Sequence, residues 1–117
     1  MPRTHKDLDV WKKSIGFVTS VYRITKTYPK DELYGLISQI RRASVSIPSN
    51  IAEGAVRKGK KEFIQFLYIA LSSASEVDTQ LIISKNLEYI NADEYEELLI
   101  ELNSISKMIQ GLIKSLN

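Results

Sequence analysis

The chain has 117 residues, 44% hydrophobic and 26% charged, which is typical of a single globular domain spanning residues 1–117. It has no cysteine, which excludes disulfides, thiolate metal sites and cysteine nucleophiles, and its one histidine, His5, cannot build a histidine cluster or a Ser-His triad. The net charge of +2 conceals an asymmetry: residues 1–61 carry +8 and residues 62–117 carry −6, which indicates either a basic binding face or neighbouring basic and acidic helices that neutralise each other.

Apolar residues recur at helical spacing in four segments, and no segment alternates as a β-strand would. The expected core line of the first segment is Leu8, Trp11, Ile15, Val18, Tyr22 and Thr25. Asp7 precedes this line as an N-cap, and Pro29 disfavours helical backbone at Tyr28. We therefore predict a helix over about 7–27.

The second segment contains the stretch SIPSNIAEG, residues 46–54, in which a proline falls within an apolar-periodic run. The core line here is Leu36, Ile40, Ala43, Ile47, Ile51 and Gly54. Its phase is the same on both sides of Pro48, so we predict one helix over about 32–57 that bends at the proline. A proline inside an exposed helix costs about 3 kcal/mol, which tertiary packing must offset.

The last two segments have equally regular patterns. Gly59 separates the second from the third, whose core line is Phe63, Leu67, Ala70, Ala74, Val77 and Leu81. Asn91 and Glu94 have the spacing of a capping box, and the line that follows is Tyr95, Leu98, Leu102, Ile105, Ile109, Leu112 and Leu116. Helices over about 61–86 and 92–115, added to the first two, predict an all-α, antiparallel up-down-up-down four-helix bundle.

The second and third helices carry unusually few charges. Outside their core lines stand Ser38, Val45, Ser49 and Val56 on the second and Phe66, Tyr68, Ile69, Ile82 and Ile83 on the third. A surface helix of a monomeric bundle normally has a charged outer face. We therefore predict a homo-oligomer that associates through these two helices, the alternative being a monomer with a mildly apolar surface.

A polar stripe accompanies these apolar faces. It comprises Gln39, Arg42, Ser46, Asn50 and Glu53 on the second helix and Ser73, Glu76 and Gln80 on the third. We predict a hydrogen-bonded network between helices or subunits, in which Arg42 meets Glu53 or Glu76. A catalytic or metal-binding pair of Glu53 and Glu76 is disfavoured, because carboxylate metal sites in bundles usually add histidines. We expect no enzymatic activity, no catalytic residue, no metal and no cofactor.

A basic cluster lies at the junction of the second and third helices. It consists of Arg57, Lys58, Lys60 and Lys61, and Lys12 and Lys13 of the first helix extend it. The cluster favours binding to the backbone of structured RNA, because no aromatic-interleaved RNA motif is present. The alternatives are an ordinary solvated loop, or a scaffold that docks another protein through Trp11 or the acidic start of the fourth helix.

No apolar run approaches the roughly 20 residues that span a bilayer, and the N-terminus lacks the apolar core of a signal peptide. We therefore expect no membrane partner and a cytoplasmic location.

Three stretches together carry a family resemblance: YPKDELYGL at 28–36, QIRRASVSIPSNIAEG at 39–54 and EFIQFLYIALSSASEVDTQL at 62–81. They resemble the four-helix proteins encoded in intervening sequences of bacterial 23S ribosomal RNA genes, also called S23 ribosomal protein homologues. The resemblance implies a homopentameric ring and a nucleic-acid role, in which the basic cluster would repeat as a rim. Accessory proteins of diversity-generating retroelements are similar pentamers that bind RNA and reverse transcriptase. The family's polar positions correspond to Gln39, Arg42, Ser46, Asn50, Glu53, Glu76 and Gln80, without established chemistry.

Overall fold

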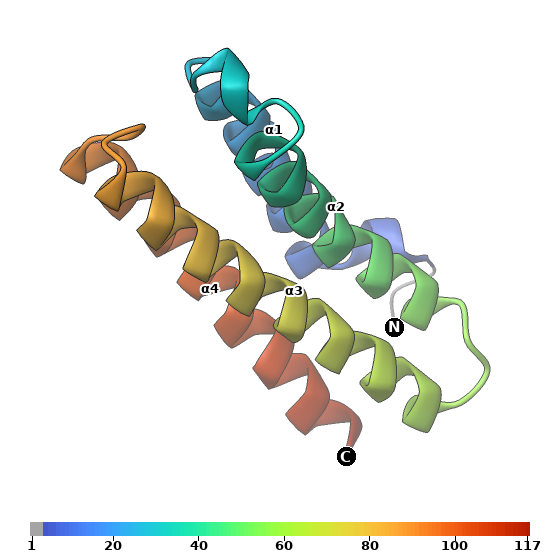
Figure 1. Cartoon of the computed structure of the whole chain (residues 1–117). Coiled ribbons are helices and arrows are strands. Elements are labelled where there is room, and N and C mark those ends of the chain that lie inside the picture. Colours follow the sequence, from blue (N-terminus) through green and yellow to red (C-terminus); the bar gives the residue numbers. More distant parts are fainter. Residues whose placement is uncertain (1–3) are drawn as a thin grey trace.

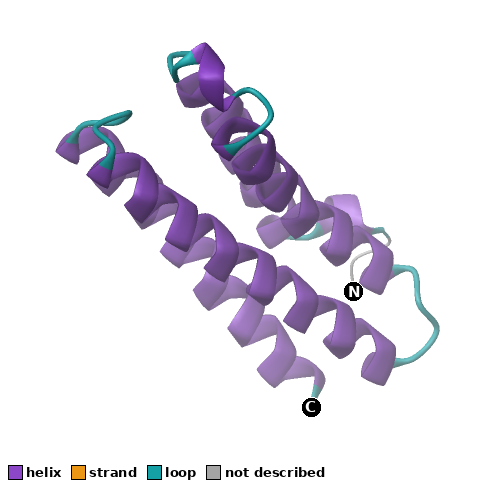
Figure 2. Ribbon diagram, viewed as in Figure 1, coloured by secondary structure: helices purple, strands orange, loops and turns teal. Residues whose placement is uncertain are grey.

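The computed structural model describes residues 4–117 and contains four α-helices with two short 3₁₀ turns. In chain order these are η1 (His5–Asp7), α1 (Asp9–Thr25), η2 (Lys30–Glu32), α2 (Leu36–Ala55), α3 (Lys60–Asn86) and α4 (Ala92–Leu116). Successive helices run antiparallel and pack against each other, and α1 also packs against α4 (Figure 1). No strand occurs in residues 4–117 (Figure 2). The predicted all-α four-helix bundle is confirmed.

The core is built from the faces predicted for the second, third and fourth helices. All six residues of the α2 line are buried, and so are all of the α3 line except Phe63, which is half-buried. The buried residues of α4 are Leu98, Leu102, Ile105, Ile109 and Ile113. The first four were predicted, whereas Tyr95, Leu112 and Leu116 of the predicted line are half-buried. The most extensive helix pair is α2 with α3, the two helices whose core lines contain the most small residues. Among residues 4–117, no helix is long and apolar enough to cross a bilayer.

The first helix is rotated relative to the prediction. Its buried residues are Val10, Ser14, Phe17, Val21 and Thr25, whereas Ile15 and Tyr22 of the predicted line are 41% and 39% exposed. Apart from Thr25, each buried residue precedes a predicted one by a single position, about 100° around the helix. The buried hydroxyls of Ser14 and Thr25 donate to the carbonyls of Trp11 and Val21, at 2.8 and 2.7 Å. Small polar residues can therefore occupy the core line, and the prediction based on apolar residues was wrong by one position.

Two helix boundaries also differ from the predictions. Asp7 does not cap α1, because it belongs to η1, where its carboxylate accepts the Thr4 N–H at 3.2 Å; the N-cap of α1 is Leu8. The second helix begins at Leu36, since Gly35 has a non-helical backbone with φ −113° and ψ −113°. The Glu32 carboxylate instead accepts the Leu36 N–H at 3.1 Å, which satisfies a free donor at the helix start.

The stretch 46–54 is helical throughout, with Pro48 inside α2 as predicted. The predicted bend at the proline stays a prediction. Gly54, after the proline, shows why a small residue is needed near the end of α2. A Cβ there would lie 2.8 Å from Phe63 Cδ1 and from Phe66 Cβ. The last turn of α2 therefore approaches the first turns of α3 more closely than any residue with a side chain would permit.

Candidate nucleic-acid interface

The loop between α2 and α3 and the first turn of α3 present the predicted basic cluster. Arg57 is held against the protein, because its guanidinium pairs with Glu53 at 3.2 Å and its Cζ lies 4.8 Å from the centroid of the Phe66 ring. Lys58, Lys60 and Lys61 are exposed, and none has an ion-pair partner within residues 4–117. Three of the four cations are therefore free to meet phosphates.

Other lysines gather in the same half of the bundle. The antiparallel topology places the start of α1, the α2–α3 loop and the end of α4 toward one end (Figure 1). Lys12 and Lys13 lie there as predicted, exposed on the first turns of α1. Lys107 and Lys114 of α4 also lie there, and the sequence prediction missed them. The signal available in the sequence was the change within the fourth helix from glutamates to lysines.

Charge is consequently separated along the 43 Å long axis of the bundle. When each helix is divided at its middle, the half with the α2–α3 loop holds nine cations and four carboxylates among the described residues, a net +5. The opposite half holds six cations and ten carboxylates, a net −4. A polyanion would be attracted to the first half, here called the basic end, and repelled from most of the second.

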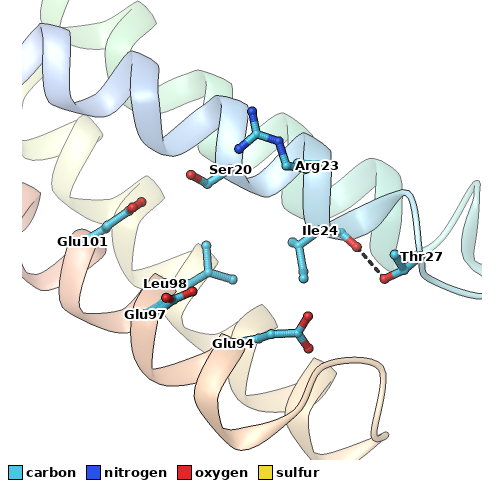
Figure 3. A pocket seen from close by; sticks show the side chains of 8 residues that line it. All are labelled: Ser20, Arg23, Ile24, Thr27, Glu94, Glu97, Leu98 and Glu101. Carbon is cyan, nitrogen blue, oxygen red and sulfur yellow. Dashed lines mark hydrogen bonds between the residues drawn. The ribbon is translucent and has the colours of Figure 1, made fainter.

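The opposite half contains an acidic groove between α1 and α4 with a volume of about 320 Å³ (Figure 3). Its lining comprises Ser20, Arg23 and Ile24 of α1, Thr27 of the turn that follows it, and Glu94, Glu97, Leu98 and Glu101 of α4. Thr27 is held by a 2.7 Å bond to the Ile24 carbonyl, and Glu94 by the capping box with Asn91. Three carboxylates beside two apolar side chains suit a basic protein segment better than RNA.

The two scaffold contacts predicted from the sequence, the acidic start of α4 and Trp11, have different environments. The acidic start of α4 faces this groove and is accessible. Trp11 is half-buried against the core, with its ring centroid 5.1 Å from that of His5. Trp11 lies in the first turns of α1 and lines a different depression, whereas the groove is lined by Ser20, Arg23 and Ile24 farther along the same helix.

The polar stripe forms short local groups. Asn50 donates to the Ser46 hydroxyl at 2.9 Å and Ser73 donates to it from α3 at 2.8 Å, so these three residues connect the two helices. Further along α3, Gln80 donates to Glu76 at 3.3 Å, while its own side-chain oxygen is buried with no donor among the described residues.

The predicted pairing of Arg42 is wrong within the chain. Glu53 pairs with Arg57, Glu76 bonds to Gln80, and Arg42 is exposed without an ion-pair partner in residues 4–117. Gln39 is likewise exposed on the outer surface of α2. The two carboxylates Glu53 and Glu76 thus each have their own partner, and no group of three or more potential metal ligands forms in the described part of the chain.

The outer faces of α2 and α3 are as apolar as predicted. Val56 is 71% exposed, Tyr68 55% and Ile69 48%, and Val45, Ile82 and Ile83 are exposed as well. Phe66 is the exception, since it is half-buried beneath the Arg57 guanidinium. Apolar area of this kind on adjacent helices is typical of a surface that another chain covers.

A tyrosine pair connects the helix ends opposite the basic end. The Tyr28 and Tyr89 rings lie 5.2 Å apart, and the Tyr89 hydroxyl donates to Glu32 at 2.9 Å. Burial raises the pKa of Tyr28, and the hydrogen bond to the Glu32 carboxylate raises the pKa of Tyr89. Glu32 therefore joins the start of α2 to the α3–α4 connection.

Comparison with known proteins agrees with this architecture. Residues 6–111 match the family described as 23S rRNA-intervening sequence protein. A solved structure of a protein of unknown function from the S23 ribosomal protein family of Bacteroides thetaiotaomicron is similar, with a TM-score of 0.81 and 29% identity. The match covers 90% of this chain and 98% of that one. A search of curated proteins finds no match.

Proposed function

Because the chain belongs to the 23S rRNA-intervening sequence protein family, we propose that it binds structured RNA through the basic end of the bundle. The observation that carries the proposal is the convergence of exposed lysines from α1, the α2–α3 loop with the first turn of α3, and α4 on one end. The contacts are to phosphates, since lysines without a fixed partner provide charge and no fixed geometry for reading bases. Neither the family description nor the similar structure assigns an enzymatic activity.

The salt dependence of binding tests this proposal. Lys58, Lys60 and Lys61 are replaced together by glutamine, which removes three positive charges from exposed positions and leaves the core intact. Each phosphate contact contributes roughly 0.7–0.9 to the slope of log K against log salt. The triple variant should bind a structured ribosomal RNA fragment more weakly, with a slope flatter by about 2 to 3, measured by fluorescence anisotropy at several salt concentrations.

A matched control removes charge from the opposite half. Arg23 and Lys85 are exposed there, and replacing both with glutamine changes the net charge without altering the basic end. This double variant should bind with nearly the wild-type slope. Equal effects per charge in both variants would mean that net charge, and not the basic end, governs binding. Unchanged binding by the triple variant would refute the proposal.

Self-association is the second part of the proposal: the outer faces of α2 and α3 join copies of the chain into a homo-oligomer, a pentameric ring. The exposed Tyr68, Ile69, Ile82 and Ile83 support it. In a ring the basic ends would form one multivalent rim, which would raise the avidity for a long RNA.

Light scattering tests the oligomer, with an expected mass of five times the 13.3 kDa chain. Ile69→Lys with Ile82→Lys should reduce the mass, because it places charges on the apolar faces of α3. Ile100→Lys on α4, where the side chain is already 67% exposed, should leave the mass unchanged. A wild-type mass equal to one chain would refute self-association.

A protein-interaction scaffold is the competing function, and the acidic groove between α1 and α4 favours it. That surface would take a basic segment of another protein. If purified protein binds no RNA at low salt, the groove becomes the better candidate, and Glu97→Gln with Glu101→Gln should then weaken capture of a basic partner.

A further inference from the structure

Two adjoining depressions lie where α1 meets the start of α2, in the half opposite the basic end. One has a volume of about 490 Å³ and the other of about 300 Å³, and they share Leu33, Ile37 and Arg41 as lining residues. Volumes of this order suit a small ligand group such as one nucleotide. We call the surface formed by Tyr22, Leu33, Tyr34, Ile37, Arg41 and Arg42 the aromatic–arginine groove.

The charge of this groove is opposite to that of its surroundings. The half of the bundle that contains it has a net charge of −4, yet no carboxylate lines either depression. The lining includes four cations, namely Lys26, Lys30, Arg41 and Arg42. The acidic groove lies on the other flank of α1, against α4. An anion entering here would thus meet a local concentration of positive charge within an acidic half.

Arg41 is held in position by the protein and still has N–H donors available for a ligand. Its Cζ lies 4.5 Å from the centroid of the Tyr22 ring, and its Nε donates to the Thr25 hydroxyl at 2.9 Å. A second, longer bond of 3.4 Å reaches the Tyr22 carbonyl. A guanidinium has five N–H donors, so three remain without an acceptor among the described residues. Such a fixed planar fork is suited to phosphate.

Tyr34 is the most exposed of the large hydrophobic side chains described, at 92%. Its turn is nevertheless fixed, because the Glu32 carboxylate bonds to both the Leu36 N–H and the Tyr89 hydroxyl. Gly35 makes this possible: a Cβ there would lie 2.8 Å from the carboxylate oxygen of Glu32. The ring of Tyr34 is therefore presented to solvent from a held backbone, next to the depression that it lines together with Tyr22.

We propose that the aromatic–arginine groove binds a single-stranded RNA segment, with a base stacked on Tyr34 and the adjoining phosphate held by Arg41 and Arg42. Exposed aromatic rings beside cations are the usual composition of single-strand sites, where stacking is tolerant of base identity. This inference rests on the proposed RNA-binding function and adds a second, chemically different contact to it. The basic end would hold a structured region by its phosphates, and the groove would hold an unpaired strand by its bases.

The test uses a short single-stranded RNA that contains 2-aminopurine, whose fluorescence reports stacking. Wild-type protein should change the fluorescence saturably. Tyr34→Leu, which keeps an apolar side chain and removes the ring, should abolish the change and weaken binding by at least about tenfold. Tyr34→Phe should retain both. Ile100→Ala, at an exposed position on α4 in the same half, is the matched surface control.

The outcomes separate this inference from the proposed function. The Lys58, Lys60 and Lys61 triple variant should lose affinity for structured RNA and keep the 2-aminopurine response. If wild-type protein binds structured RNA but gives no stacking response, this inference falls alone. If it binds no RNA of either kind, both fall. A Tyr34→Leu variant that binds RNA normally but has an altered oligomeric mass would show that a second copy of the chain covers the groove, and would overturn the inference.

Discussion

The close approach of α2 and α3 at Gly54 allows a quantitative prediction. In Gly54→Ala the new methyl group would lie 2.8 Å from Phe63 Cδ1 and from Phe66 Cβ, and 3.2 Å from the Phe63 carbonyl oxygen. A side-chain atom can turn away, but the carbonyl oxygen and the Cβ are fixed by the helix that carries them. Relief therefore requires the end of α2 to move away from α3.

The magnitude follows from two opposing effects. Overpacking a well-packed site costs about 1–3 kcal/mol, and contact with backbone places Gly54→Ala in the upper part of that range. Alanine favours the helix over glycine by up to about 1 kcal/mol. We therefore expect the free energy of unfolding to fall by about 1–2 kcal/mol, which for a chain of this size lowers the melting temperature by roughly 4–8 °C.

Urea and thermal unfolding measure this change, and two other glycines provide matched controls. A Cβ at Gly16 or Gly111 meets nothing within 4 Å, and both residues are exposed in helices. Gly16→Ala and Gly111→Ala should be neutral or more stable by up to about 1 kcal/mol. A Gly54→Ala variant as stable as these controls would refute the reasoning that α2 and α3 are fixed in contact there.

Three further predictions concern polar groups. Ser73→Ala removes the 2.8 Å bond to Ser46 between α3 and α2, so it should lower the unfolding free energy by about 1 kcal/mol in urea denaturation, and no loss would mean that the bond contributes nothing. Asn91→Ala removes the capping box with Glu94 and should cost about 1 kcal/mol in the same assay, whereas a stability equal to wild type would contradict a role for the cap. Because burial raises the pKa of Tyr28 above 10.0, its contribution to stability is fully present below pH 10 and is lost as the pH rises through the folded-state pKa. In thermal melts from about pH 8 to 12, Tyr28→Phe should therefore lose less stability than wild type, and parallel curves would contradict this assignment.

The helical pattern predicted the fold well where apolar residues define a single line. The predicted lines of the second, third and fourth helices lie on the faces that α2, α3 and α4 direct to the core, and the Asn91–Glu94 capping box is present. The helix continues through Pro48, because the phase of its apolar line is the same on both sides. The spacing of apolar residues along a helix reflects which of its faces is buried. These faces could therefore be predicted without knowing which helices pack against them.

The first helix shows where periodicity is insufficient. It has two adjacent lines, and the one with more apolar residues faces the edge of α2, where Trp11, Ile15 and Val18 line a depression with Val45 and Pro48. The buried line includes two hydroxyl residues, Ser14 and Thr25, whose side chains donate hydrogen bonds to backbone carbonyls of the same helix. A ranking of the two lines by hydrophobicity alone places this one second, although it is the line that is buried in the core.

The candidate binding residues also divide into those that the sequence predicts and those that only the fold brings together. The basic cluster at Arg57–Lys61 could be predicted from the sequence because its members are neighbours in the chain. The lysines of α4 join it because antiparallel packing reverses the order of every second helix. The aromatic–arginine groove could not be predicted from the sequence. Tyr22, Tyr34 and Arg41 belong to three different local patterns, and they line one depression only because the α1–α2 connection brings the two helices together.

Local chemistry in the chain therefore specified the four helices, their order, the faces of three of them and one basic cluster. These properties depend on residues within a few turns of one another, and hydrogen bonding and burial along one helix determine them. The rotation of α1, the separation of charge into two ends and the composition of both grooves depend on which helices become neighbours. Packing decides these, because residues distant in sequence acquire a shared environment when the bundle closes.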